Sequence, residues 1–168
     1  MAEGEIPPAA IAGAVAAAKG VLRLDASGED ALLATLAASA VLIAEAFVGA
    51  RLIVRGFEDR VAADGRWHPL VATPVTTLVA AGLAVDIDAA GTGWVRAHGG
   101  GVVGVTYAAG LAATWEAVPA AIAQGVALLV AHLFEHREHG AAPPAAIAAL
   151  WRPWRRVRVG SARREQGR

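Results

Sequence analysis

Apolar residues recur at three- and four-residue spacing in two parts of the chain, residues 32–47 and 122–133, a period typical of helices that bury one side. Between these two parts, short β-branched runs are broken by Gly, Pro and Asp, as in strands joined by turns. Because the strands do not alternate with helices, the pattern indicates an α+β fold: a mainly helical core of about four helices with a small antiparallel sheet or hairpin region. We expect the helices at residues 8–19, 28–49, 115–139 and 143–151, and the strands within residues 51–108.

The longest predicted helix has a recognisable start. The Ser27 hydroxyl can accept a hydrogen bond from an amide of the first turn, and Asp30 places a negative charge at the positive end of the helix. The helix is expected to stop near Gly49. One of its faces is assigned to the core rather than to an interface, with a stripe at Leu32, Leu36, Ile43 and Phe47 and with Leu33 and Ala40 beside it.

Proline and glycine mark the ends of the other helices. Gly20 is expected to end the first helix and Gly140 the third. Pro119 is tolerable in the first turn of the third helix, where no carbonyl needs its missing amide hydrogen. The pair Pro143-Pro144 opens the last short helix. The apolar stripe of the third helix is expected at Ile122, Val126, Leu129, Val130 and Leu133.

Two short motifs resemble ligand-binding loops in residue pattern, but they lack the structural position or the ligand residues that such loops need. Residues 99–104 read G-x-G-x-x-G, yet these glycines precede a strand and do not join a strand to a helix, so we expect a hairpin turn. Residues 86–91 begin like a calcium loop, but alanine occupies the ligand positions at Ala90 and Ala97. This second motif is interpreted as a turn between strands.

His132, Glu135 and His136 spell H-x-x-E-H, the pattern of one class of zinc hydrolases. Histidines four residues apart share a helix face and can reach one metal, while the glutamate handles the protons of its water. A third protein ligand is still needed, and only His139 lies near the same face. We interpret the motif as the polar edge of a helix and expect no metal and no cofactor; a zinc hydrolase is kept as the least favoured alternative.

Composition narrows the classes of function. The chain has no cysteine, so neither a disulfide framework nor a thiolate site is available, and a reducing compartment fits. The opening MAEGEIPP does not read as a signal peptide. The two longest apolar segments, residues 31–44 and 117–134, each fall short of about 20 cleanly apolar residues, so no membrane span is expected. No spacing suggests a catalytic triad, and we expect no enzyme.

Charge is distributed unevenly along the chain. The formal net charge is zero, but residues 151–168 hold seven arginines against one glutamate, for a net charge of +6, which leaves −6 on the rest. The chain is therefore predicted to divide into a domain over residues 1–150 and a basic C-terminal arm over residues 151–168. Tryptophans interleave with arginines in this arm, a mixture suited to an acidic partner surface. The alternatives are a solvated tail or a nucleic-acid-binding protein whose arm neutralises phosphates.

Three stretches follow one another in a distinctive order: EDALLATLAASAVLIAEAFVGARLI, PLVATPVTTLV and VTYAAGLAATWEAVPAAIAQGVALLVAHLFEHRE. The last combines a strand ending in V-x-Y-x-A-G, a Val-Pro helix start, and a helix that ends in an aromatic residue, an acid and an Arg-Glu pair. Together they resemble the head-tail connector (adaptor) family of long-tailed phages and gene transfer agents, over residues 25–151, with residues 57–104 departing most. The matching positions are Val105, Tyr107, Ala109, Gly110, Val118, Pro119, Phe134, Glu135, Arg137 and Glu138.

The resemblance implies a structural protein that forms a ring, usually twelvefold, with copies of itself beneath the portal protein. The ring would extend the DNA channel toward a stopper or tail-completion protein, and DNA would pass through without sequence-specific binding. Such a chain belongs in the neck of a virion or phage-like particle, and in the host cytoplasm before assembly. The C-terminal segment of the family typically clasps the portal, so the portal contact is expected at Trp151, Arg152, Trp154, Arg155, Arg156, Arg158, Arg163 and Arg164.

Overall fold

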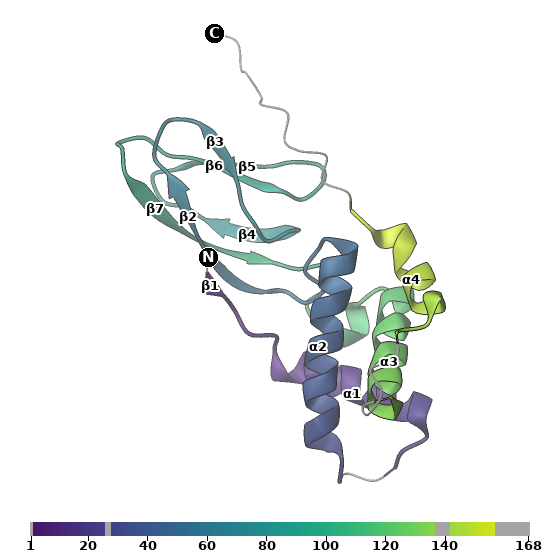
Figure 1. The fold of residues 1–168 in the computed structure, drawn as a ribbon. Coiled ribbons are helices and arrows are strands. Elements are labelled where there is room, and N and C mark those ends of the chain that lie inside the picture. The colour runs from purple at the N-terminus through teal and green to yellow at the C-terminus, as the bar shows by residue number, and fades with distance from the viewer. Residues whose placement is uncertain (1, 26–27, 137–141, 157–168) are drawn as a thin grey trace.

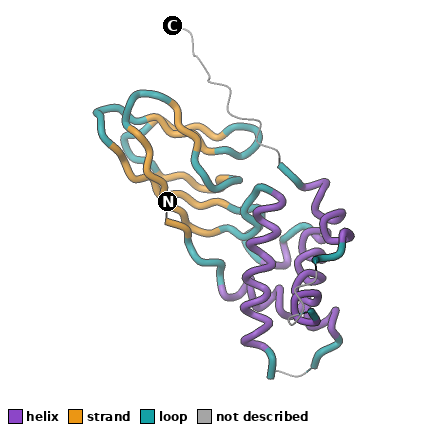
Figure 2. Tube along the Cα trace, viewed as in Figure 1, coloured by secondary structure: helices purple, strands orange, loops and turns teal. Residues whose placement is uncertain are grey.

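The α+β fold predicted from the sequence is confirmed by a computed structural model, which describes residues 2–25, 28–136 and 142–156. Helices gather at one end of the molecule and strands at the other (Figures 1 and 2). In chain order the helices are α1 (Pro8–Leu22), α2 (Asp30–Val48), α3 (Ala120–Glu135) and α4 (Ala145–Trp151), with short 3-10 turns η1 (Trp115–Ala117) and η2 (Arg152–Trp154).

The expected antiparallel region is present within the described residues, and it divides into two sheets. The first has the strand order β1-β2-β7-β4, formed by Ala2–Glu3, Arg55–Ala62, Val102–Ala109 and Val75–Val79. The second has the order β3-β6-β5, formed by Trp67–Pro69, Gly93–Arg96 and Ala84–Ile87. Buried and exposed residues alternate along β2, so that Phe57 and Val61 face a core shared by the two sheets while Glu58 and Arg60 face solvent.

The glycine-rich segment before β7 is not the hairpin turn that the sequence suggested. Every residue of β2 pairs with β7, and β6 belongs to the other sheet, so this segment carries the chain from one sheet to the other. Gly99, Gly100 and Gly101 all have positive φ, a conformation that other residues adopt only with strain. The backbone carbonyl of Ala63 accepts from the Gly100 amide at 3.0 Å, which ties the crossing to the end of β2.

The predicted turn at residues 86–91 is confirmed, and it joins β5 to β6. Asp88 organises it: one carboxylate oxygen accepts from the amides of Ala90 and Thr92, both at 2.9 Å, and the other accepts from the Trp94 indole at 3.0 Å. The indole hydrogen bond, followed by the amides, lowers the pKa of Asp88 below its ordinary value. The Asp88 carboxylate thus stabilises the turn through these three hydrogen bonds.

The helix ends differ from the prediction where local signals were overridden. Helix α1 continues through Gly20 to Leu22 and ends at Arg23, whose left-handed φ of 56° closes the last turn. Helix α2 begins at Asp30 without a side-chain cap, and Ser27 lies outside the described residues. The helix predicted at 115–139 is divided, because Val118 and Pro119 are extended between η1 and α3. Its expected end at Gly140 also lies outside the described residues.

The core stripe predicted on α2 was wrong for two of its four large residues. Leu32 is 36% exposed and Ile43 is 47% exposed, and Leu36 and Phe47 are only partly buried. The buried side of α2 is the neighbouring stripe, rich in alanine, which lets α1 and α3 approach closely. This stripe consists of Leu33, Ala37, Ala40, Val41, Ala44, Glu45 and Val48.

The stripe predicted on α3 is largely confirmed. Four of its residues are buried in the helical core, and Leu133 packs partly buried against the same core. The four buried residues are Ile122, Val126, Leu129 and Val130. The molecule therefore has one core among the helices and a second between the sheets.

Candidate assembly surfaces

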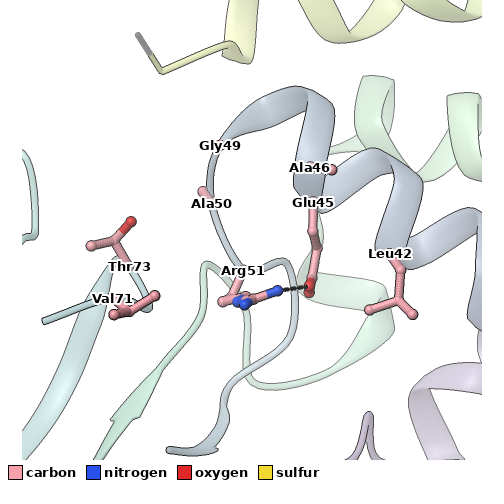
Figure 3. Close-up of a pocket in the computed structure, with 8 residues that line it drawn as sticks. All are labelled: Leu42, Glu45, Ala46, Gly49, Ala50, Arg51, Val71 and Thr73. Carbon is pink, nitrogen blue, oxygen red and sulfur yellow. Dashed lines mark hydrogen bonds and ion pairs between the residues drawn. The ribbon is translucent and has the colours of Figure 1, made fainter. Parts of the chain in front are cut away.

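A buried carboxylate joins the helical end of the molecule to the sheets. Glu45, near the end of α2, is 3% exposed and accepts hydrogen bonds from two arginines. The Arg55 guanidinium binds it with both Nη atoms at 2.8 Å. Arg51 Nη1 also binds it, at 3.0 Å, and Figure 3 shows this second contact. The Leu52 amide donates to the same carboxylate at 2.9 Å. The Glu45 carboxylate thus binds two guanidinium groups and one amide from residues 51–55, the segment that enters β2. These bonds fix the helices relative to the first sheet.

A hollow of about 350 Å³ opens beside this ion pair. Leu42 and Ala46 line it from α2, and Val71 and Thr73 line it from the segment between β3 and β4 (Figure 3). Leu42 and Val71 are each about half exposed. Apart from the Glu45–Arg51 pair, the lining residues carry no charge. The hollow is therefore a mixed surface, in which Leu42 and Val71 supply apolar area beside the Glu45–Arg51 ion pair.

The Val71 side of the hollow is held in place by Tyr107. The tyrosine hydroxyl donates to Asp59 at 2.8 Å and accepts from the Ala72 amide at 2.9 Å, and the Val71 amide donates to the same Asp59 oxygen at 2.8 Å. Burial, with the neighbouring carboxylate, raises the pKa of Tyr107, so the phenol stays protonated and able to donate. Tyr107 belongs to the V-x-Y-x-A-G motif, and its role here is to position a loop.

Trp151, the first residue of the predicted portal contact, lies in the helical core. It is 3% exposed, its indole donates to the Ile122 carbonyl at 3.2 Å, and its ring packs against Phe47 with a centroid distance of 5.7 Å. Gly125 on α3 provides the room, because a Cβ at that position would collide with the indole. The side chain of Trp151 thus holds α4 against α3, and the available contact surface of the arm begins after it.

The next residues of the arm run along the body. The Arg156 amide donates to the Val48 carbonyl at 2.7 Å, and its guanidinium donates to the Ala90 carbonyl at 2.6 Å in the β5–β6 turn. Gly49 permits this approach, because it has φ +74° and a Cβ there would lie 2.8 Å from the Arg156 carbonyl oxygen. Arg155 lies over the Phe47 ring, 5.8 Å from its centroid. These contacts lead the chain from the helical end to the sheet end.

Exposed groups of the arm remain for a partner. Arg152, Arg155 and Arg156 are exposed, and Trp154 is 41% exposed. Arg158, Arg163 and Arg164 lie outside the described residues. The structure therefore brings one exposed tryptophan together with three exposed arginines beyond the core.

The H-x-x-E-H motif lies on the last turns of α3. The rings of His132 and His136 stack with centroids 4.4 Å apart, and His136 Nδ1 lies 3.0 Å from the His132 carbonyl. His132 is buried, whereas Glu135 and His136 are exposed. Within the described residues no cluster of three potential metal ligands occurs; His139 lies outside them. Glu135 and His136 form the polar helix edge expected from the sequence, whereas His132 is buried.

Chains from gene transfer agent particles share this fold over nearly its full length. A chain in the neck of an empty particle, computed with C6 symmetry, is 29% identical with a TM-score of 0.75, and the match covers 97% of this chain and 100% of that chain. A chain from the virion of a native particle is 31% identical with a TM-score of 0.73, over 95% and 97% of the two chains. This chain belongs to the head-tail connector (adaptor) family. The match extends across residues 57–104, where the connector resemblance was weakest in sequence.

A third chain comes from the neck of a native gene transfer agent particle computed with C12 symmetry. It is 30% identical with a TM-score of 0.67, over 97% of this chain and 100% of that chain. No family model and no curated protein sequence matches this connector. The solved structures place its fold among components of gene transfer agent particles, in two cases from the particle neck.

Proposed function

We propose that this connector forms a twelvefold ring beneath the portal, extends the DNA channel and links the head to the stopper or tail-completion protein. The observation that supports this most strongly is the match over 97% of the chain to a neck protein computed with C12 symmetry. A closed ring needs each subunit to use two different faces, one for each neighbour. A further surface must contact the portal, and we assign that contact to the C-terminal arm.

We assign the portal contact to the exposed part of the arm: Arg152, Trp154, Arg155, Arg156, Arg158, Arg163 and Arg164. Arginine pairs bidentately with carboxylates, and an exposed tryptophan supplies apolar contact area, so the partner surface should be acidic with an apolar pocket. Trp151 contributes indirectly, because its burial fixes the point from which the arm departs. The net charge of +6 on residues 151–168 attracts such a surface before contact.

Capture by tailless, DNA-filled heads tests this function. The full chain is compared with a chain that ends at Arg156, which keeps Trp151 and every described contact of the arm. We expect capture of the full chain and about tenfold or greater weakening for the truncated chain, since each charge-assisted arginine contact typically contributes about 1.5–3 kcal/mol. A full-length R158Q/R163Q/R164Q variant controls for length and should weaken capture similarly.

The capture results distinguish an error in the assigned portal contact from an error in the proposed connector function. Equal capture of all three chains would retain the connector function and contradict the assignment of residues 157–168 to the portal contact. If no chain bound heads, while free DNA bound the full chain with an affinity falling steeply with salt, the nucleic-acid-binding alternative would replace the connector function. A flat salt response would contradict that alternative.

The negative charge of the body suits a channel that DNA must traverse without sticking. Residues 1–150 carry a net charge of −6, and exposed acids on the sheets include Glu58 and Asp86. We expect an E58K/D86K variant to slow DNA ejection from assembled particles, most strongly at low salt, because lysines would attract phosphates. Ejection kinetics at two salt concentrations measure this. E135K, on an exposed acid of α3, is the matched control; unchanged ejection in E58K/D86K would remove the proposed repulsion from these sheet acids.

A further inference from the structure

The outward face of α2 contains no charged residue over four turns. Only Asp30 and Glu45 are charged in this helix; Asp30 forms an ion pair with Lys19 at the start, and Glu45 is buried. From the first to the last position the face extends about 21 Å at the usual helical rise. The face consists of Leu32, Thr35, Leu36, Ser39, Leu42, Ile43 and Ala46, all exposed except the partly buried Leu36.

The two hydroxyl residues do not make this face polar. Thr35 Oγ1 donates to the Ala31 carbonyl at 3.1 Å, and Ser39 Oγ donates to the Thr35 carbonyl at 3.0 Å. Both hydroxyl hydrogens therefore point back into the helix, and a partner would meet mainly carbon at these positions. A helix that faces water normally presents charged or strongly polar side chains there. This α2 face instead has the charge depletion typical of interface centres.

The face continues into the hollow beside Glu45. Leu42 and Ala46 belong to both, and the half-exposed Val71 extends the apolar surface onto the sheet end. A stable interface buries about 800 Å² on each partner, which is more than one helix face supplies. The α2 face would therefore form the apolar centre of a contact whose rim includes the hollow.

The chemistry of the face favours a second copy over the other occupants. Residues 157–168 carry four arginines, which would be left without partners on an uncharged surface. Lipid fits poorly as well, although α2 is long and apolar enough to cross a membrane: its other side packs in the helical core, where Glu45 binds Arg55. Related connector chains occur in necks computed with sixfold and twelvefold symmetry, where identical copies surround an axis.

We propose that the uncharged outward face of α2 packs against a neighbouring copy of this chain in the ring. The inference rests on the proposed ring and names the surface that closes it. In a rotational ring the contact is head-to-tail, so this face meets a different surface of the neighbour and never its own counterpart. Helix α1 packs against the buried side of α2. The outer surface of α1 therefore lies on the opposite side of the subunit from the outward face of α2.

A photo-crosslinker at Ser39 identifies the occupant directly. The chain has no cysteine, so S39C gives a single attachment site for a benzophenone maleimide in the middle of the face. After capture by tailless heads and illumination, we expect an adduct with the mass of two copies, mapped by peptide mass spectrometry to a surface other than α2. V79C, on the most exposed apolar side chain of β4, is the matched control and should give much less of this adduct.

Charge on the face gives an independent readout. I43E places a carboxylate at an exposed position, so the monomer should fold with an unchanged circular dichroism spectrum and thermal midpoint. Capture by heads should become non-cooperative and weaken by about tenfold or more, because the contact would bury an unpaired charge. V79E provides the same chemical change away from the face and should be captured like the unmodified chain.

Three outcomes would overturn the α2 contact and leave the connector function in place. They are an adduct to another head protein, an adduct that joins two copies at position 39 of each, and normal cooperative capture of I43E.

If heads captured no chain at all, the proposed function would be contradicted. Illumination of the concentrated S39C protein alone would still test the surface. Two-copy adducts there would retain the contact between copies, and their absence would overturn it. Vesicles of neutral phospholipid should yield no lipid adduct; a strong one would assign the face to a membrane.

Discussion

Replacing Glu45 with alanine is expected to destabilise the connector fold by about 3–5 kcal/mol, the usual cost of removing one partner of a buried ion pair. The Arg55 guanidinium, on a residue that is 6% exposed, would lose the carboxylate that binds both of its Nη atoms. The Leu52 amide would lose its acceptor in the same change. Urea unfolding followed by tryptophan fluorescence measures the difference in the free energy of unfolding.

Two further variants show whether the buried charge is responsible. E45Q keeps the shape and an acceptor for the Leu52 amide but lacks the charge, so its loss of stability should lie between those of the unmodified chain and E45A. E135A removes an exposed acid from α3 and should change stability by less than about 0.5 kcal/mol. A loss below about 1 kcal/mol in E45A would mean that the pair behaves like a solvent-screened one.

The sequence predicted the helices well, but it could not show which side of α2 the neighbouring helices would cover. Large apolar residues suggested the stripe that includes Leu32 and Ile43, whereas the buried stripe has alanine at three of its seven positions. Small residues are favoured there because α1 presents its own alanines, and close backbone approach contributes more contact than larger side chains would at a greater separation. One signal was available: Glu45, an acid within a long apolar run, falls on the buried stripe.

Interactions across long sequence separations account for most of what the sequence did not reveal. Glu45 of α2 pairs with Arg55 of β2, ten residues later, where the helices meet the first sheet. Asp59 and Tyr107, 48 residues apart, meet because β2 and β7 are neighbouring strands. The resemblance pointed to Tyr107 through its motif, but the motif gave no reason for the tyrosine. The structure supplies it, since the hydroxyl positions the loop that lines the hollow beside α2.

The arm shows how a local composition can be misleading for a single residue. The resemblance implies a portal contact for the C-terminal segment, so it predicts the same role for Trp151, Arg155 and Arg156. Its position in α4, four residues after the buried Ile147, places it instead on the side that faces α3. Trp154, three residues further on and half exposed, fits the interface role better. The distinction depends on Gly125, a residue 26 positions earlier, which no local pattern connects to the tryptophan.

Replacing Trp151 with alanine is therefore expected to destabilise the connector by about 3–5 kcal/mol, the range for removing a large aromatic side chain from a core. W151F retains part of the packing against Phe47 but loses the hydrogen bond to the Ile122 carbonyl, so it should lie between W151A and the unmodified chain. W154A, the matched control three residues on, should change the free energy of unfolding by less than about 0.5 kcal/mol. Urea unfolding and head capture are measured on the same proteins. If W151A kept full stability but lost capture, Trp151 would act at the portal, as the sequence alone suggested, and its place in the core would be wrong.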